Sequence, residues 1–166
     1  MSVELPEAYV LSIQMSNELR GKQIRFCQLQ DYQKLQRIGF INKNLSDFDR
    51  LSGGRIQSVV SRGNVVRVKL DNGMYLLLAP EYGGRIRYYT KESIVPAKFH
   101  LKLCFSDDTA LTVALAGMGV IQALKDDELE SSYVYRRDFS QVASPTDDKE
   151  FTLERFAEEL TDKNVN

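Results

Sequence analysis

Apolar residues near the start of the chain recur at intervals of three and four. The positions concerned are Ala8, Leu11, Met15 and Leu19. Pro6 precedes this run and Gly21 follows it. Proline is favoured in the first turn of a helix and glycine just past its end. The spacing therefore predicts an amphipathic N-terminal helix between these two residues.

From Arg55 onward the pattern changes to alternation and short β-branched runs that are separated by turn residues. Asp71-Asn72-Gly73 between two such runs is a strong hairpin signal. The predicted strands are 22–29, 56–60, 65–70, 74–78, 85–89, 100–105, 110–114 and 120–124, and a short helix is predicted at 47–51. Many short strands with tight turns, bracketed by helices, favour a mainly β (α+β) fold. We expect two packed antiparallel sheets, a β-sandwich, with an N-terminal helix and further flanking helices.

The last part of the chain differs in composition from the strand-rich part. It is polar and acidic until Phe151, where Thr152 could cap a helix and Phe151 could pack against Phe156. We therefore expect a β-sandwich domain over 1–135 and an acidic linker over 136–150. A helical region would then begin over 151–166 and be cut short.

Composition and charge narrow the class of protein. With 166 residues, 43% hydrophobic and 27% charged, the chain is typical of one globular domain. No apolar run reaches the roughly 20 residues of a membrane helix, so we expect a cytoplasmic protein without a membrane partner. Residues 1–100 carry 15 Lys/Arg against 9 Asp/Glu, and residues 101–166 carry 7 against 14. This split is consistent with one basic face, although an evenly mixed surface would also satisfy it.

The cysteines and the histidine do not form a metal-binding pattern. Cys27 and Cys104 stand apart within strand-like segments, and His100 is the only histidine. They cannot complete a usual zinc site, so we expect buried reduced thiols, no metal, and a strand role for His100.

Four segments, in order, resemble the N-terminal part of the formamidopyrimidine-DNA glycosylase/endonuclease VIII family. They are Glu4-Leu5-Pro6-Glu7, Ser61-Arg62-Gly63-Asn64, Tyr82-Gly83-Gly84-Arg85-Ile86 and Glu150-Phe151-Thr152-Leu153-Glu154. Their order and spacing are more specific than any single segment. The resemblance covers nearly the whole chain.

The resemblance implies a helix-flanked β-sandwich that faces DNA in base-excision repair. Family enzymes flip a damaged base out of duplex DNA, cut its glycosidic bond and cleave the strand as AP lyases. In longer members a helix-two-turn-helix region follows, so 151–166 would be its start, and a zinc finger would lie beyond Asn166. On this basis we expect no cofactor in this chain, a monomer, and duplex DNA with a damaged or abasic site as partner.

The resemblance also implies that catalysis uses an N-terminal amine and a nearby glutamate. Glu4 takes the place of that glutamate, although an acid in a first helical turn could simply favour the helix dipole. Val3 takes the nucleophile's place, but a peptide nitrogen cannot form a Schiff base. Removal of Met1 would expose the Ser2 amine, displaced by up to about 3.5 Å. We therefore expect impaired activity.

Six positions are candidates for DNA contact on the same grounds: Arg62, Asn64, Tyr82, Arg85, Lys98 and Met118. Asn64 replaces the family's lysine, whereas Tyr82 and Met118 replace residues that fill the space left by the flipped base. The basic residues would bind phosphates. For each the alternative is an ordinary turn, loop or charged surface.

Three hypotheses remain open at this stage. The first is a working glycosylase/lyase that uses Ser2 and Glu4, and the second is a non-catalytic DNA-lesion binder. The third is a protein-interaction module on the same fold.

Overall fold

The computed structural model describes residues 5–81 and 83–142 of the chain. It opens with helix α1 (Leu5–Leu19), as the apolar spacing predicted. Ala8, Met15 and Leu19 of this helix are buried. The helix therefore turns the predicted apolar face toward the core.

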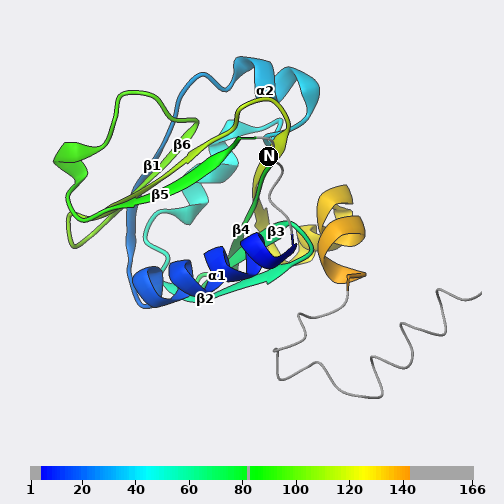
Figure 1. Cartoon of the computed structure of the whole chain (residues 1–166), viewed down its shortest axis with the longest axis horizontal. Helices are drawn as coiled ribbons and strands as arrows, with labels where there is room; N and C mark the ends of the chain where they lie inside the picture. Colours follow the sequence, from blue (N-terminus) through cyan, green and yellow to red (C-terminus); the bar gives the residue numbers. More distant parts are fainter. Residues whose placement is uncertain (1–4, 82, 143–166) are drawn as a thin grey trace, which may run out of the picture.

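Eight strands form two antiparallel sheets of four (Figure 1). The β1 sheet has the order β1 (Ile24–Leu29), β6 (Leu101–Phe105), β7 (Ala110–Ala114) and β5 (Arg85–Tyr89). The β2 sheet has the order β2 (Ile56–Arg62), β3 (Val65–Leu70), β4 (Met74–Pro80) and β8 (Gly119–Lys125). This arrangement confirms the expected β-sandwich.

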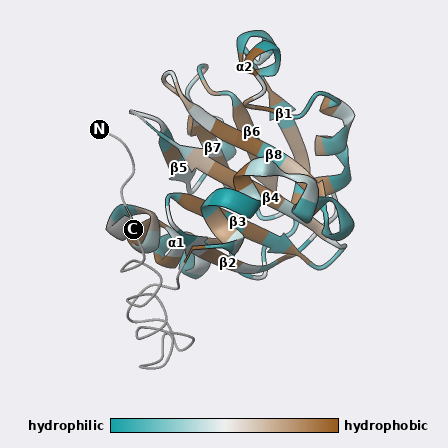
Figure 2. Cartoon of the chain, turned by 90° about the vertical axis from the view of Figure 1, so that its right-hand side faces the viewer, coloured by the Kyte–Doolittle hydropathy of each residue, from teal (hydrophilic) through white to brown (hydrophobic). Residues whose placement is uncertain are grey.

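The core lies between the two sheets. Alternate residues of each strand point inward, for example Leu101, Leu103 and Phe105 on β6 and Val66 and Val68 on β3. Figure 2 shows this as hydrophobic strands at the centre of the molecule, with α2 at its periphery. The period-two pattern is thus explained by one buried face per strand.

The two open sides of the sandwich are covered by different elements. Helix α1 covers the side between β2 and β5, as Figure 1 shows. On the other side, the 3₁₀ helix η1 (Leu45–Leu51) packs beside β1 and β8, and Ile41 forms a bridge with Ile121. Each sheet edge near these elements is therefore shielded from solvent.

The glutamine-rich stretch before Gly39 contains a helix that the sequence pattern did not predict. Helix α2 (Gln33–Ile38) buries one side chain, Leu35, and ends at Gly39 with a backbone φ of 82°. A single apolar anchor gives too little periodicity to identify so short a helix from sequence.

The chain after β8 folds back onto the outer face of the β2 sheet. The 3₁₀ helix η3 (Asp126–Ser131) leads into the helical turn η4 (Tyr135–Ser140), whose Phe139 is 3% exposed. Residues 136–142 of the expected linker are thus ordered against the sheet. The remainder of that segment and the region 151–166 lie outside the described residues, so the division into domains stays a prediction.

Candidate nucleic-acid interface

Antiparallel strand directions bring three connections to the same end of the sandwich. Pro80 pairs with Gly119, and Arg85 pairs with Ala114. The β4–β5 loop therefore lies beside the β7–β8 loop. The β2–β3 turn reaches the same end, because Val66 pairs with Leu78 near the end of β4. We call the turn 62–64 and the loops 80–84 and 115–118 the three-loop end.

Small residues let the loops of this end approach closely. A Cβ atom added to Gly84 would lie 2.8 Å from the Cβ of Pro80, and one added to Gly83 would lie 3.6 Å from the Cβ of Ala116. Gly84 therefore allows the tight turn within the loop 80–84, whereas Gly83 lies against the loop 115–118.

The beginning of α1 also points to the three-loop end. The backbone N–H of Gly21 donates to the carbonyl of Ile56 at 2.8 Å, and Ser12 and Ser61 join through their hydroxyl groups at 3.2 Å. Helix α1 thus runs antiparallel to β2. From Ser12 back to the helix start is about 10 Å at 1.5 Å per residue, which matches about 10 Å from Ser61 to the turn at 3.3 Å per residue. The candidate catalytic residues Ser2 and Glu4 lie outside the described residues.

Asn64 links the β2–β3 turn to the β4–β5 loop. Its side-chain amide donates a hydrogen bond of 2.7 Å to the carboxylate of Glu81. Both side chains are half-buried. The amide nitrogen of Asn64 is therefore already hydrogen-bonded to a carboxylate. The Glu81 side chain places this hydrogen-bond acceptor directly beside Asn64.

Arg62 packs against the helical turn η4 rather than pointing freely outward. Its guanidinium lies 6.0 Å from the centre of the Phe139 ring and donates to the carbonyl of Val142 at 3.4 Å. The side chain is half-buried. Arg62 is thus at the three-loop end but is also part of the packing there.

Met118 of the three-loop end is exposed, and so are Arg85, directly after its loop 80–84, and Lys98, which precedes β6. Arg85 begins β5, and Met118 has 51% of its surface exposed. Lys98 lies two residues before His100, whose Nδ1 accepts a 2.8 Å hydrogen bond from the backbone of Leu115. Neither cation has a hydrogen-bond or ion-pair partner within 5–81 and 83–142. Tyr82 lies outside the described residues.

His100 serves the loop structure through that hydrogen bond. An Nδ1 that accepts a hydrogen bond belongs to a neutral ring, and burial lowers the pKa of His100, which also favours the neutral form. The residue stands directly before β6, one position outside the strand in which it was predicted.

The two cysteines behave as apolar residues. Burial raises the pKa of Cys27 to about 12 and that of Cys104 to about 11. Among the described residues no group of three or more His, Cys, Asp or Glu is placed to hold a metal ion. In the same part of the chain, no helix has the length and apolar character needed to cross a membrane.

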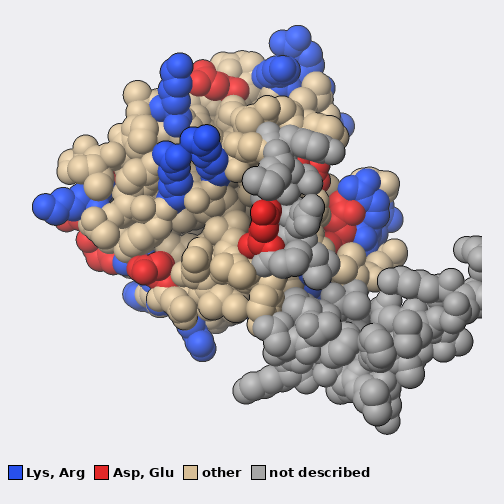
Figure 3. Space-filling view, in the orientation of Figure 1, with Lys and Arg blue, Asp and Glu red and all other residues tan. Residues whose placement is uncertain are grey.

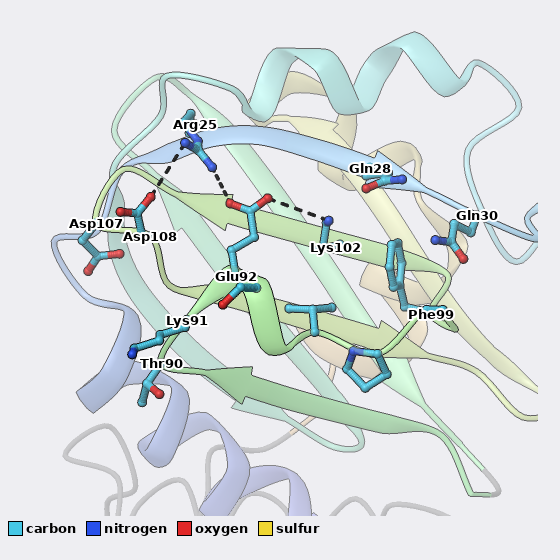
Figure 4. A pocket seen from close by; sticks show the side chains of 14 residues that line it. Arg25, Gln28, Gln30, Thr90, Lys91, Glu92, Phe99, Lys102, Asp107 and Asp108 are labelled. Atoms are coloured by element: carbon cyan, nitrogen blue, oxygen red, sulfur yellow. Dashed lines mark hydrogen bonds and ion pairs between the residues drawn. The ribbon is translucent and has the colours of Figure 1, made fainter.

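A hollow of about 950 Å³ lies away from the three-loop turns, on the outer face of β1 and β6 (Figure 4). Of the three cations that line it, Arg25 and Lys102 are paired with carboxylates and Lys91 is not paired within the described residues. Glu92 of the short 3₁₀ helix η2 (Glu92–Ile94) pairs with both Arg25 and Lys102, and Arg25 also lies 3.9 Å from Asp108. Sequence patterns could not reveal this hollow, because the segment 90–99 that covers it has no periodicity. The paired charges do not point to one class of ligand.

Known proteins resemble the chain in sequence family and in fold. The family described as the formamidopyrimidine-DNA glycosylase N-terminal domain matches residues 3–115. No curated protein sequence matches the chain.

Several solved structures share the fold at 20% sequence identity. A structure of MutM in complex with carbocyclic 8-oxo-G containing DNA has a TM-score of 0.65 and covers 80% of this chain and 48% of that one. Lactococcus lactis Fpg in complex with an abasic site containing DNA has a TM-score of 0.64 and covers 77% and 45%. The same protein with an N7-Benzyl-Fapy-dG containing DNA gives 0.64, 77% and 46%.

The chain spans about half the length of these solved structures. The family match covers more than two thirds of the residues of this chain. The matched residues include most of the strands and loops whose order is described above. The chain therefore belongs to the formamidopyrimidine-DNA glycosylase N-terminal domain family.

Proposed function

We propose that this chain is the DNA-facing domain of a base-excision repair protein of the glycosylase/AP lyase type. It binds duplex DNA that carries a damaged or abasic site, and its own catalytic activity is impaired. The observation that carries the proposal is the grouping of Arg85, Lys98 and Met118, all exposed, at or beside the three-loop end of a family fold.

The two cations support binding to the DNA backbone. Arg85 and Lys98 are exposed and have no carboxylate partner in the described part of the chain. Unpaired Arg and Lys side chains supply affinity for phosphates that does not depend on sequence. The grouping therefore fits a polyanionic partner better than an apolar one.

Met118 supports preference for a damaged site. It stands on a loop that carries glycine on either side, and half of its surface is exposed. Apolar side chains of this kind wedge between base steps, and a missing or damaged base lowers the cost of unstacking. Met118 would thus favour a duplex that is already interrupted.

The impairment rests on residues at two places. Asn64 cannot transfer a proton as a lysine can, and its amide is bonded to Glu81, whose carboxylate would repel an approaching phosphate. At the N-terminus, the Ser2 amine is one residue away from the position that the family alignment of Glu4 requires. A misplacement near 1 Å can already cost about 100-fold in rate. We further propose a cytoplasmic monomer that needs no cofactor in this chain.

Binding to a labelled duplex with and without a central tetrahydrofuran site tests the binding part. We expect tighter binding to the abasic duplex, and Met118→Ala should reduce that preference. Ile94→Ala is the matched control, because Ile94 is also an exposed apolar residue (58%) but lies on η2 beside the hollow. Equal affinity of the wild type for both duplexes would contradict lesion recognition, and no binding at low salt would favour a protein-interaction module.

Borohydride trapping on a duplex with a natural abasic site tests the impairment. The mass of the mature protein should be measured on the same sample to identify its first residue. We expect no covalent adduct at enzyme concentrations that give full binding. A stoichiometric adduct would show an active lyase and overturn that part of the proposal.

A further inference from the structure

Strand β5 carries cationic side chains that extend away from the three-loop end. Arg85 and Arg87 lie two residues apart and therefore project from the same face of the sheet. Both are exposed. Their neighbours on β7 are Ala114 and Thr112, which are small and uncharged. Lys91, also exposed, follows the end of the strand. We call Arg85, Arg87 and Lys91 the β5 track.

The β5 track is not neutralised by the protein. None of its three side chains makes a hydrogen bond or an ion pair within the described ranges. Glu92, which follows Lys91 directly, is paired with Arg25 and Lys102 instead, as Figure 4 shows, and Glu81 accepts a hydrogen bond from Asn64. The same sheet thus contains one group of compensated cations and one group of uncompensated cations.

The track forms a continuous surface with the candidate interface. In Figure 3, blue side chains lie near the middle of the face in view, among uncharged neighbours, and acidic side chains lie further toward its edges and beside the grey residues. Arg85 is the residue at which the track meets the three-loop end. The strand from Arg85 to Tyr89 spans about 13 Å at 3.3 Å per residue, and the chain bends at Thr90 before it reaches Lys91. The strand alone corresponds to the rise of about four base pairs.

We infer that the β5 track is a second contact surface for duplex DNA, which binds backbone phosphates of the arm beside the damaged site. The inference rests on the proposed function, because it assumes that the site itself lies at the three-loop end. An anionic backbone suits this surface, since its cations are separated by strand spacing and their neighbours, Thr112 and Ala114, offer no apolar patch for a protein partner.

The test compares two double variants with the same change in charge. Arg87→Gln/Lys91→Gln removes two of the three cations of the track and leaves Arg85 and the three-loop end intact. Arg20→Gln/Lys125→Gln removes two exposed cations at the opposite end, after α1 and at the end of β8. Equal thermal midpoints of both variants and the wild type show that folding is retained, as expected for exposed side chains.

Affinity for abasic-analogue duplexes is measured between 50 and 200 mM salt, with arms of 3 or 12 base pairs. Each lost phosphate contact lowers the slope of log K against log salt by about 0.9, so the track variant should lose about 1.8. The loss should occur only with long arms and equally for intact and abasic DNA. The control variant should keep the wild-type slope.

The outcomes separate the two proposals. An unchanged slope in the track variant, with lesion preference retained in the wild type, overturns this inference alone. Equal loss in both double variants also overturns it, because net charge would then explain the effect. A third outcome combines two results: the wild type shows no lesion preference, and the slope is still smaller in the track variant than in the wild type. This outcome overturns lesion recognition and supports the track as a DNA contact.

Discussion

The two ends of the sandwich differ in how their charged side chains are used. At the end opposite the three loops, Lys22 binds the carboxylate of Asp107, and Asp71 accepts a 2.8 Å hydrogen bond from the backbone of Arg55. Beside the three-loop end, Arg85 and Lys98 have no such partners in the described part of the chain. Charges that hold turns together are satisfied within the fold, whereas the unsatisfied ones are available to a partner.

One glycine at each end provides a further comparison, which leads to the largest expected effect. A Cβ on Gly119, at the three-loop end, would lie 2.7 Å from the carbonyl oxygen of Ala79, and the backbone φ is 143°. A Cβ on Gly73, at the opposite end, would meet nothing within 4 Å at a φ of 80°. We predict that Gly119→Ala destabilises the domain by about 4 kcal/mol, through backbone strain and steric overlap together.

Gly73→Ala is the control for backbone conformation alone. It should cost about 1 kcal/mol, since only the left-handed conformation opposes a side chain there. Urea unfolding of both variants measures the difference. Similar free energies of unfolding would mean that the loops at Gly119 move apart easily, and the close approach of β4 and β8 would not be needed for stability.

Substitution of Phe139 tests whether the segment after β8 stabilises the β2 sheet beside the three-loop end. Its ring packs with Val65, Leu77 and Ala79 on the outer face of the β2 sheet and lies 4.9 Å from the Arg67 guanidinium. Phe139→Ala should lower the free energy of unfolding by about 3 kcal/mol, at the low end for buried phenylalanine because the site is a small cluster. Urea unfolding provides the measurement.

Tyr133→Ala is the matched control, since Tyr133 is 60% exposed. It should change the free energy of unfolding by less than about 0.5 kcal/mol. If Phe139→Ala changes the free energy of unfolding as little as Tyr133→Ala, the segment 136–142 does not stabilise the sheet. The packing of Arg62 on Phe139 would then not be needed for the stability of the β2–β3 turn.

The main elements of the fold follow from the sequence because strands and α1 have one buried face. The predicted ranges 65–70, 85–89 and 110–114 coincide with β3, β5 and β7. Helix α2 and the turn η4 were not predicted, because each depends on a single buried residue, Leu35 or Phe139. The burial of such a single residue becomes apparent only in the tertiary structure, where the sheet that it contacts is seen.

The family resemblance singled out Asn64, Arg85 and Met118 as candidates for DNA contact, and that role stays a prediction. The structure brings the three residues to one end of the sandwich, which the sequence did not indicate. The Asn64–Glu81 hydrogen bond joins residues 17 positions apart and could not be read from either segment. Likewise, the sequence marks Arg25 and Arg87 alike as strand cations, and only tertiary structure shows that Glu92 neutralises the first.

The charge pairing at the end opposite the three loops should make the stability of the domain depend on pH in the acidic range. Burial acts to raise the pKa of Asp107, but hydrogen bonds from Lys22 and Thr109 outweigh it and lower the pKa from 3.8 to about 2. The ionised form is thus favoured in the folded state, so its contribution is complete above pH 4 and is lost as the pH falls through 2. Asp107→Asn should be less stable than wild type at pH 7.

The difference between Asp107→Asn and wild type should shrink between pH 4 and pH 2, as followed by urea midpoints. Asp127→Asn is the control, because Asp127 is exposed and has no partner within the described residues. Asp107 is itself largely exposed, so the effect should remain small. A difference that stays constant down to pH 2 would argue that the carboxylate is not paired.

The smallest expected effect concerns the thiols, which report how firmly the β1 sheet is covered. Thiolates react with disulfide reagents, and a pKa of about 11 or 12 leaves roughly one thiolate in a thousand or fewer at pH 8. Cys27→Ser and Cys104→Ser, each with one remaining thiol, should react at least about two hundredfold more slowly when native than when unfolded, because about a quarter of an unfolded thiol is thiolate at this pH.

Cys104 faces Glu92 and the segment that covers the outer sheet, whereas Cys27 packs against the core. Glu92→Gln removes the carboxylate shared by Arg25 and Lys102 and should therefore speed labelling of Cys104 but not of Cys27. Equal acceleration of both would mean that the ion pairs support the whole sheet rather than its outer cover. The neutralised cations beside the hollow would then have a global structural role, and the contrast with the free arginines of β5 would become sharper.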